Sequence, residues 1–121
     1  MKKKILTVDD SSSVRQMVKM TLSQAGYDIV EAGNGQEGLD SAKRAPMDMV
    51  VTDPNMPVMN GLGLILELRK LPDYRGVPIL FLTTESDAEV KKEAKAAGAT
   101  GWITKPFQQD QLVALVKKVL G

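Results

Sequence analysis

Residues 49–57 read Met-Val-Val-Thr-Asp-Pro-Asn-Met-Pro, an apolar run that leads into an acidic residue and two prolines. The apolar run is typical of a strand buried on both faces, and the prolines end regular structure directly after it. Because the residue before a proline favours an extended backbone, Pro54 predicts that Asp53 continues the strand. A lone Asp before Pro also commonly begins a turn, so the role of Asp53 depends on its surroundings.

The composition is that of an ordinary globular domain. The chain has 121 residues, 43% of them hydrophobic, and a formal net charge of +1. We therefore expect one domain over residues 1–121 without an output domain, as a cytoplasmic monomer that binds neither nucleic acid nor membrane. No apolar run approaches the ~20 residues of a membrane span. The absence of cysteine and histidine excludes disulfides, thiol catalysis, a Ser-His-Asp triad and imidazole metal ligands.

Short apolar segments alternate with segments of helical periodicity along the whole chain. The predicted strands cover residues 5–8, 27–32, 47–53, 77–83 and 101–105. The first predicted helix follows a cap at residues 11–13 and ends at Gly26. The other predicted helices cover residues 36–44, 62–71, 87–97 and 109–120. This alternation predicts an α/β fold with a five-stranded parallel sheet and helices on both faces. The common strand order for such a flavodoxin-like chain is 2-1-3-4-5.

That strand order would gather polar residues at one edge of the sheet. Asp9 and Asp10 follow the first strand and would stand beside Asp53, with Thr83 above the fourth strand and Lys105 above the fifth. Converging carboxylates repel one another unless a cation binds them, and a site with oxygen ligands alone favours Mg²⁺.

The same residues suggest phosphoryl transfer. The Asp53 carboxylate can act as a nucleophile toward a phosphoryl group, while the Thr83 hydroxyl and the Lys105 ammonium stabilise the transferring oxygens. Taken singly, each of these residues has a plainer explanation as a helix cap or a strand-end residue. Their joint placement at the ends of four strands favours a site.

A glycine pattern offers a competing hypothesis. Residues 33–38 read Gly-Asn-Gly-Gln-Glu-Gly and match the dinucleotide fingerprint G-x-G-x-x-G. However, the pattern follows the second predicted strand, away from the switch point, and the chain is too short for the second half of a dinucleotide fold. We therefore interpret it as a turn and the start of a helix.

Five motifs together resemble the receiver domains of two-component response regulators, and among these the single-domain chemotaxis regulators. The motifs are Val-Asp-Asp at 8–10, Thr-Asp-Pro-Asn-Met-Pro at 52–57, Asn-Gly at 60–61, Leu-Thr-Thr-Glu at 82–85 and Lys-Pro-Phe at 105–107. The resemblance implies that Asp53 is the phosphoacceptor and that a sensor histidine kinase is the donor. It also implies that Mg²⁺ is held by Asp9, Asp10, Asp53 and the main-chain oxygen of Asn55.

The resemblance implies further roles around the phosphoryl group. Thr83 would move to meet it, together with Thr84 in the loop that follows, and Lys105 would pair with it through a cis Lys105–Pro106 bond. Asn55 and Glu85 would flank the water that hydrolyses the acyl phosphate, which favours a short-lived signal.

The sequence departs from the family pattern at three positions. Pro54 has no N–H to offer a phosphoryl group. Trp102 replaces a tyrosine that turns inward on activation in these relatives. Asn60 replaces a common aspartate, although either residue can cap a helix. The first two departures bear on timing and switching rather than on the site.

The function expected from the resemblance is a phosphorylation-driven switch of protein binding rather than an enzyme acting on outside substrates. The flagellar motor switch is the implied partner, together with a phosphatase. One alternative is a phosphorelay intermediate or phosphate sink. Another is a Mg²⁺-dependent phosphatase, which the absence of a substrate-enclosing cap domain disfavours.

Overall fold

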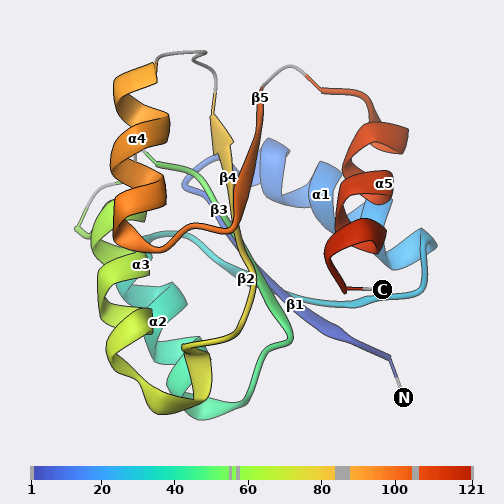
Figure 1. The fold of residues 1–121 in the computed structure, drawn as a ribbon. Helices are drawn as coiled ribbons and strands as arrows, with labels where there is room; N and C mark the ends of the chain where they lie inside the picture. The colour runs from blue at the N-terminus through green and yellow to red at the C-terminus, as the bar shows by residue number, and fades with distance from the viewer. Residues whose placement is uncertain (1, 55, 57, 84–87, 105–106, 121) are drawn as a thin grey trace.

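The computed structural model describes residues 2–54, 56, 58–83, 88–104 and 107–120. Its strands form one parallel sheet in the order β2-β1-β3-β4-β5, which confirms the predicted topology (Figure 1). The strands are β1 (Lys4–Val8), β2 (Asp28–Ala32), β3 (Met49–Thr52), β4 (Ile79–Thr83) and β5 (Gly101–Thr104). Among the described residues, no helix is long and apolar enough to cross a membrane.

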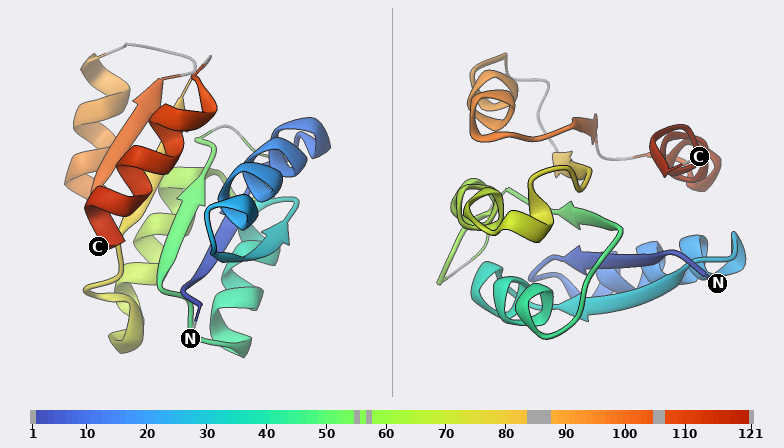
Figure 2. Two further views of the ribbon diagram at one scale, coloured as in Figure 1. Left: turned by 90° about the vertical axis from the view of Figure 1, so that its right-hand side faces the viewer. Right: turned by 60° about the horizontal axis from the view of Figure 1, so that its bottom comes forward.

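Helices cover both faces of this sheet. They are α1 (Ser12–Gln24), α2 (Gly35–Arg44), α3 (Gly61–Lys70), α4 (Ala88–Ala97) and α5 (Gln109–Leu120). Figures 1 and 2 show α1 and α5 on one face, and α2, α3 and α4 on the other. Within the described part of the chain, the helices lie along the faces of the sheet and not across the carboxyl ends of its central strands (Figure 1).

The core divides along the sheet as the helices do. On the α1 and α5 face, Ile5, Met49 and Val51 pack with side chains of those two helices. On the other face, Leu6 and Val50 pack with side chains of α2, α3 and α4. All four residues of β3 are buried, as predicted for the central strand.

Two strands begin two residues later than predicted because side chains satisfy the backbone ahead of their first residues. β3 begins at Met49 rather than residue 47, where the Met47 N–H donates to the Tyr74 hydroxyl at 3.1 Å. β4 begins at Ile79 rather than residue 77, where the Val77 carbonyl accepts from Arg69 Nη1 at 2.7 Å. The intervening 3₁₀ helix, Pro72–Tyr74, was not predicted.

Tyr74 ties this 3₁₀ helix to the segment between α2 and β3. Its side chain is buried, and its hydroxyl lies 2.7 Å from the Ala42 carbonyl and 3.1 Å from the Met47 nitrogen. The substitution Tyr74→Phe would leave both groups unpaired in the interior, so we expect the free energy of unfolding to fall by about 1–3 kcal/mol. Urea denaturation measures this loss.

The same substitution should change how the free energy of unfolding depends on pH in alkaline solution. Burial, with smaller contributions from Asp73 and Asp48, raises the pKa of Tyr74 above its ordinary value of 10.0 although the Met47 hydrogen bond opposes the shift. The folded state therefore holds this proton more tightly, and the corresponding stability is lost as pH rises above 10. Tyr74→Phe should show a shallower loss in that range, and an unchanged slope would contradict this account.

Candidate functional site

The site lies where β1 and β3 run side by side and their connections leave in opposite directions. Val8 is level with Thr52 in the sheet register, so Asp9 and Asp53 emerge next to each other. The Asp53 N–H donates to the Val8 carbonyl at 2.9 Å, and the Asp9 N–H donates to the Ala32 carbonyl at 3.1 Å. Asp53 thus continues the pairing of the strand before it, as predicted, and Asp9 does the same although its strand was predicted to end at Val8.

The side chains of Asp9, Asp10 and Asp53 converge. One carboxylate oxygen of each lies within 4.8 Å of the others. Asp9 is 2% exposed and Asp53 is 8% exposed, whereas Asp10 faces solvent. Two buried carboxylates and one exposed carboxylate fit a hard cation that keeps some of its waters, and the all-oxygen donor set suits Mg²⁺. These three side chains could hold the ion.

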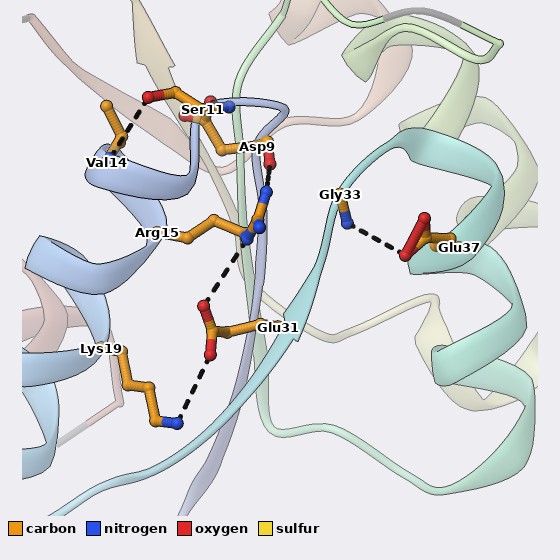
Figure 3. Close-up of polar contacts among 8 residues, drawn as sticks. All are labelled: Asp9, Ser11, Val14, Arg15, Lys19, Glu31, Gly33 and Glu37. Atoms are coloured by element: carbon orange, nitrogen blue, oxygen red, sulfur yellow. Dashed lines mark hydrogen bonds and ion pairs between the residues drawn. The ribbon is translucent and has the colours of Figure 1, made fainter.

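Asp9 is held by its neighbours in the chain and in space (Figure 3). The Ser11 N–H donates to Asp9 Oδ1 at 2.9 Å, and Arg15 Nη1 donates to the Asp9 main-chain oxygen at 2.5 Å. Ser11 also caps α1, since its hydroxyl accepts from the Val14 N–H at 3.3 Å. The predicted cap is confirmed, and Arg15 is an addition that no motif indicated.

Gly61, whose sequence context does not indicate its importance, lies against the backbone of Asp53 and Pro54. The Gly61 N–H donates to the Pro54 carbonyl at 3.0 Å, and a Cβ built on Gly61 would lie 2.5 Å from the Asp53 main-chain oxygen. Only glycine allows the start of α3 to approach Asp53 so closely. Asn60 caps this helix by accepting from the Gly63 N–H at 2.8 Å, as predicted. The adjacent Asn-Gly pair was the available signal.

The glycine fingerprint also serves packing at this edge. Asn34 caps α2, and the Gly35 N–H donates to the Met59 carbonyl at 3.1 Å. A Cβ on Gly35 would meet the Met59 oxygen at 2.3 Å. The pattern therefore marks a turn and a helix start, in agreement with the preferred interpretation. Val58, the neighbour of Met59 in the chain, has a φ of 69°, which is rare for a β-branched residue.

The structure describes some of the remaining predicted residues and not others. Thr83 ends β4 beside Thr104 of β5, at the same edge as the carboxylates. Trp102 lies on β5, half-buried, and the Lys91 Nζ of α4 lies 5.4 Å from the centroid of its ring. Five predicted features lie outside the described residues: Asn55, Thr84, Glu85, Lys105 and the Lys105–Pro106 bond.

Comparison with models of known protein families identifies the family of this chain. The model for the response regulator receiver domain matches residues 5–117. The chain therefore belongs to the response regulator receiver domain family.

Two curated relatives illustrate the range of that family. The chain is 39% identical over 120 residues to the chemotaxis protein CheY1 of Helicobacter pylori, covering 98% of this chain and 97% of that protein. It is 40% identical over 119 residues to the probable transcriptional regulator ycf27 of Porphyridium aerugineum. That match covers 98% of this chain but only 48% of the relative, so the chain spans about half the length of that protein.

Solved structures agree with the fold. The chemotaxis protein CheY4 of Vibrio cholerae superposes with a TM-score of 0.96 at 46% identity, covering 99% of this chain and 100% of that one. The receiver domain of the sensor histidine kinase PA1611 of Pseudomonas aeruginosa superposes with a TM-score of 0.92 at 26% identity, covering 100% and 99%. That receiver domain has a magnesium ion coordinated in its active-site cleft.

Proposed function

We propose that this chain is a phosphorylation-driven switch in which Asp53 accepts a phosphoryl group from the phosphohistidine of a sensor kinase. The observation that carries the proposal is the convergence of the Asp9, Asp10 and Asp53 carboxylates, whose oxygens lie within 4.8 Å of one another. Family membership and the likeness to chemotaxis proteins support it.

The Asp53 carboxylate is the attacking group in this proposal. One of its oxygens bonds to phosphorus as the bond between phosphorus and the histidine nitrogen breaks, giving an acyl phosphate. Bound Mg²⁺ supplies positive charge that offsets the charge of the transferring oxygens. Asp9, Asp10, Asp53 and the main-chain oxygen of Asn55 would hold the ion.

Other predicted residues act on the phosphoryl group once it is attached. The Thr83 hydroxyl and the Lys105 ammonium stabilise its oxygens, and Thr84 moves with the loop that closes over it. Asn55 and Glu85 flank the attacking water in hydrolysis. The position of Thr83 at the end of β4 supports its share of this role.

The output is a change in protein binding at the surface formed by α4, β5 and α5. Trp102 belongs to β5 and contacts Lys91 of α4, so a movement at the end of β4 can be transmitted to the pair. We propose a monomeric, cytoplasmic regulator that serves chemotaxis, with a flagellar motor switch protein and a phosphatase as partners.

Beryllofluoride, which mimics a phosphoryl group on aspartate, tests the switch. With Mg²⁺ present, it should shift the amide resonances of Asp53, of β4 and β5 and of the Trp102 indole in the wild-type chain. The matched variant Asp53→Asn removes the ionised carboxylate with little change in volume and should show none of these shifts. Equal shifts in both proteins would show that the mimic binds elsewhere.

A phosphorelay intermediate or phosphate sink is the second candidate, supported by the same carboxylates. Binding of a flagellar motor switch protein that strengthens with beryllofluoride favours the motor role. Transfer of the phosphoryl group from the chain to a histidine phosphotransfer protein, without such binding, favours the relay.

A further inference from the structure

Arg15 lies beside the carboxylate cluster and links three elements of the fold. It belongs to the first turns of α1, and its Nη1 donates to the main-chain oxygen of Asp9 at 2.5 Å. Its Nε lies 3.5 Å from Oε1 of Glu31 on β2. Figure 3 shows the guanidinium between these two groups, so one side chain joins α1 to the end of β1 and to β2.

We propose that Arg15 is a positioning residue for the metal site: its guanidinium holds the backbone of Asp9, and Glu31 holds the guanidinium. The inference rests on the proposed function, because it takes the three carboxylates to be the Mg²⁺ ligands. It adds a residue of α1 that is not itself one of the three carboxylates.

The contacts of Asp9 explain why a positioning residue matters. Its N–H, its carbonyl and its Oδ1 are hydrogen-bonded to Ala32, Arg15 and Ser11 respectively. The side chain is 2% exposed, so solvent does little to hold it. Groups that orient a metal ligand in this way commonly set the affinity of the site. The contact to Arg15 is made by the side chain of another residue, so a substitution can remove it.

Arginine suits this position because its planar group carries several donors in a fixed arrangement. Nη1 reaches the Asp9 carbonyl while Nε faces Glu31. The second oxygen of Glu31 lies 3.4 Å from Lys19 Nζ, one turn further along α1. The Lys19 side chain is 53% exposed, so this ion pair adds little to the hold of Glu31 on Arg15.

Removal of Arg15 takes away both a positive charge and a contact to Asp9, and these two losses have opposite expected effects on Mg²⁺ affinity. Its positive charge repels a divalent cation, so loss of the charge alone should tighten Mg²⁺ binding. Loss of the contact to Asp9 should loosen it, and removal of a group that orients a metal ligand typically costs about 10–100-fold in affinity. The sign of the change thus separates the two effects.

The experiment compares the Mg²⁺ dissociation constants of the wild type, Arg15→Gln, Glu31→Gln and Lys19→Gln, measured by titration of amide resonances. Lys19→Gln is the matched control, because it removes one positive charge from the same face of α1 without touching Asp9. We expect Arg15→Gln to bind Mg²⁺ about 10-fold more weakly, and Glu31→Gln to show a smaller weakening in the same direction. Lys19→Gln should bind as tightly as the wild type or slightly more so.

Equal or tighter binding by Arg15→Gln overturns the inference. Melting curves in EDTA show whether each variant is folded. If Arg15→Gln does not fold, the inference is overturned when Glu31→Gln binds Mg²⁺ as tightly as the wild type. Labelling by acetyl phosphate separates this failure from that of the proposed function. A wild type that binds Mg²⁺ but is never labelled refutes the function, while the predicted order of dissociation constants would still support Arg15.

Discussion

Asp10→Ala should abolish Mg²⁺-dependent phosphorylation of this chain by acetyl phosphate while leaving the fold intact. Asp10 is the exposed member of the carboxylate cluster, so its removal creates no cavity. Loss of a group that only orients a metal ligand costs about 10–100-fold in affinity, and loss of a ligand should cost at least as much. We therefore expect a labelling rate lower by about 100-fold or more at limiting Mg²⁺.

A second property of this variant separates a metal role from general damage. Without metal, three converging carboxylates repel one another, so Asp10→Ala should raise the free energy of unfolding in EDTA. The matched control is Asp40→Ala, which removes an exposed aspartate of α2 and should leave labelling unchanged. Wild-type labelling by Asp10→Ala would show that this carboxylate is not a ligand.

Gly61→Ala should both destabilise the protein and disturb Asp53. The added Cβ would lie 2.5 Å from the Asp53 main-chain oxygen and 2.9 Å from the Pro54 Cα, and neither backbone atom can turn away as a side chain can. Overpacking of this kind typically costs 1–3 kcal/mol, and we expect a loss of about 3 kcal/mol in the free energy of unfolding. Because the strain falls on Asp53 itself, Mg²⁺ binding should weaken as well.

Gly76→Ala is the matched control for this substitution. It lies in the connection before β4, and a Cβ built there meets nothing within 4 Å. Replacing a glycine by alanine where the backbone allows it stabilises a protein by about 0.4–1 kcal/mol through the unfolded state. If Gly61→Ala proved as harmless as Gly76→Ala, the close approach of α3 to Asp53 would not be required.

The sequence predicts the fold and the carboxylate cluster because both follow from local patterns. Alternating apolar and helical segments define the strand order, and that order places the ends of β1 and β3 together. Asp9 and Asp53 meet because each directly follows one of these strands. No contact between distant side chains had to be known in advance.

Other features depend on contacts between segments far apart in the chain, which no local pattern encodes. The Tyr74 hydroxyl donates a hydrogen bond to the Ala42 carbonyl, 32 positions away in the chain. It also accepts a hydrogen bond from the Met47 N–H, and this contact shortens β3. Gly61 matters through its approach to the Asp53 backbone, whereas its sequence context indicates only the start of a helix. Arg15 lies on the polar side of α1, where arginine is common. Its role depends on Glu31, a residue of β2 that is distant in the sequence.

Locating the phosphoryl group tests the proposed role of Asp53 most directly. After reaction with acetyl phosphate and Mg²⁺, borohydride reduces an acyl phosphate and converts the modified aspartate to homoserine, which peptide mass spectrometry assigns to a position. We expect homoserine at position 53, absent when EDTA replaces Mg²⁺. Homoserine at position 9 or 10, or equal conversion of Asp53 without the metal, would contradict it.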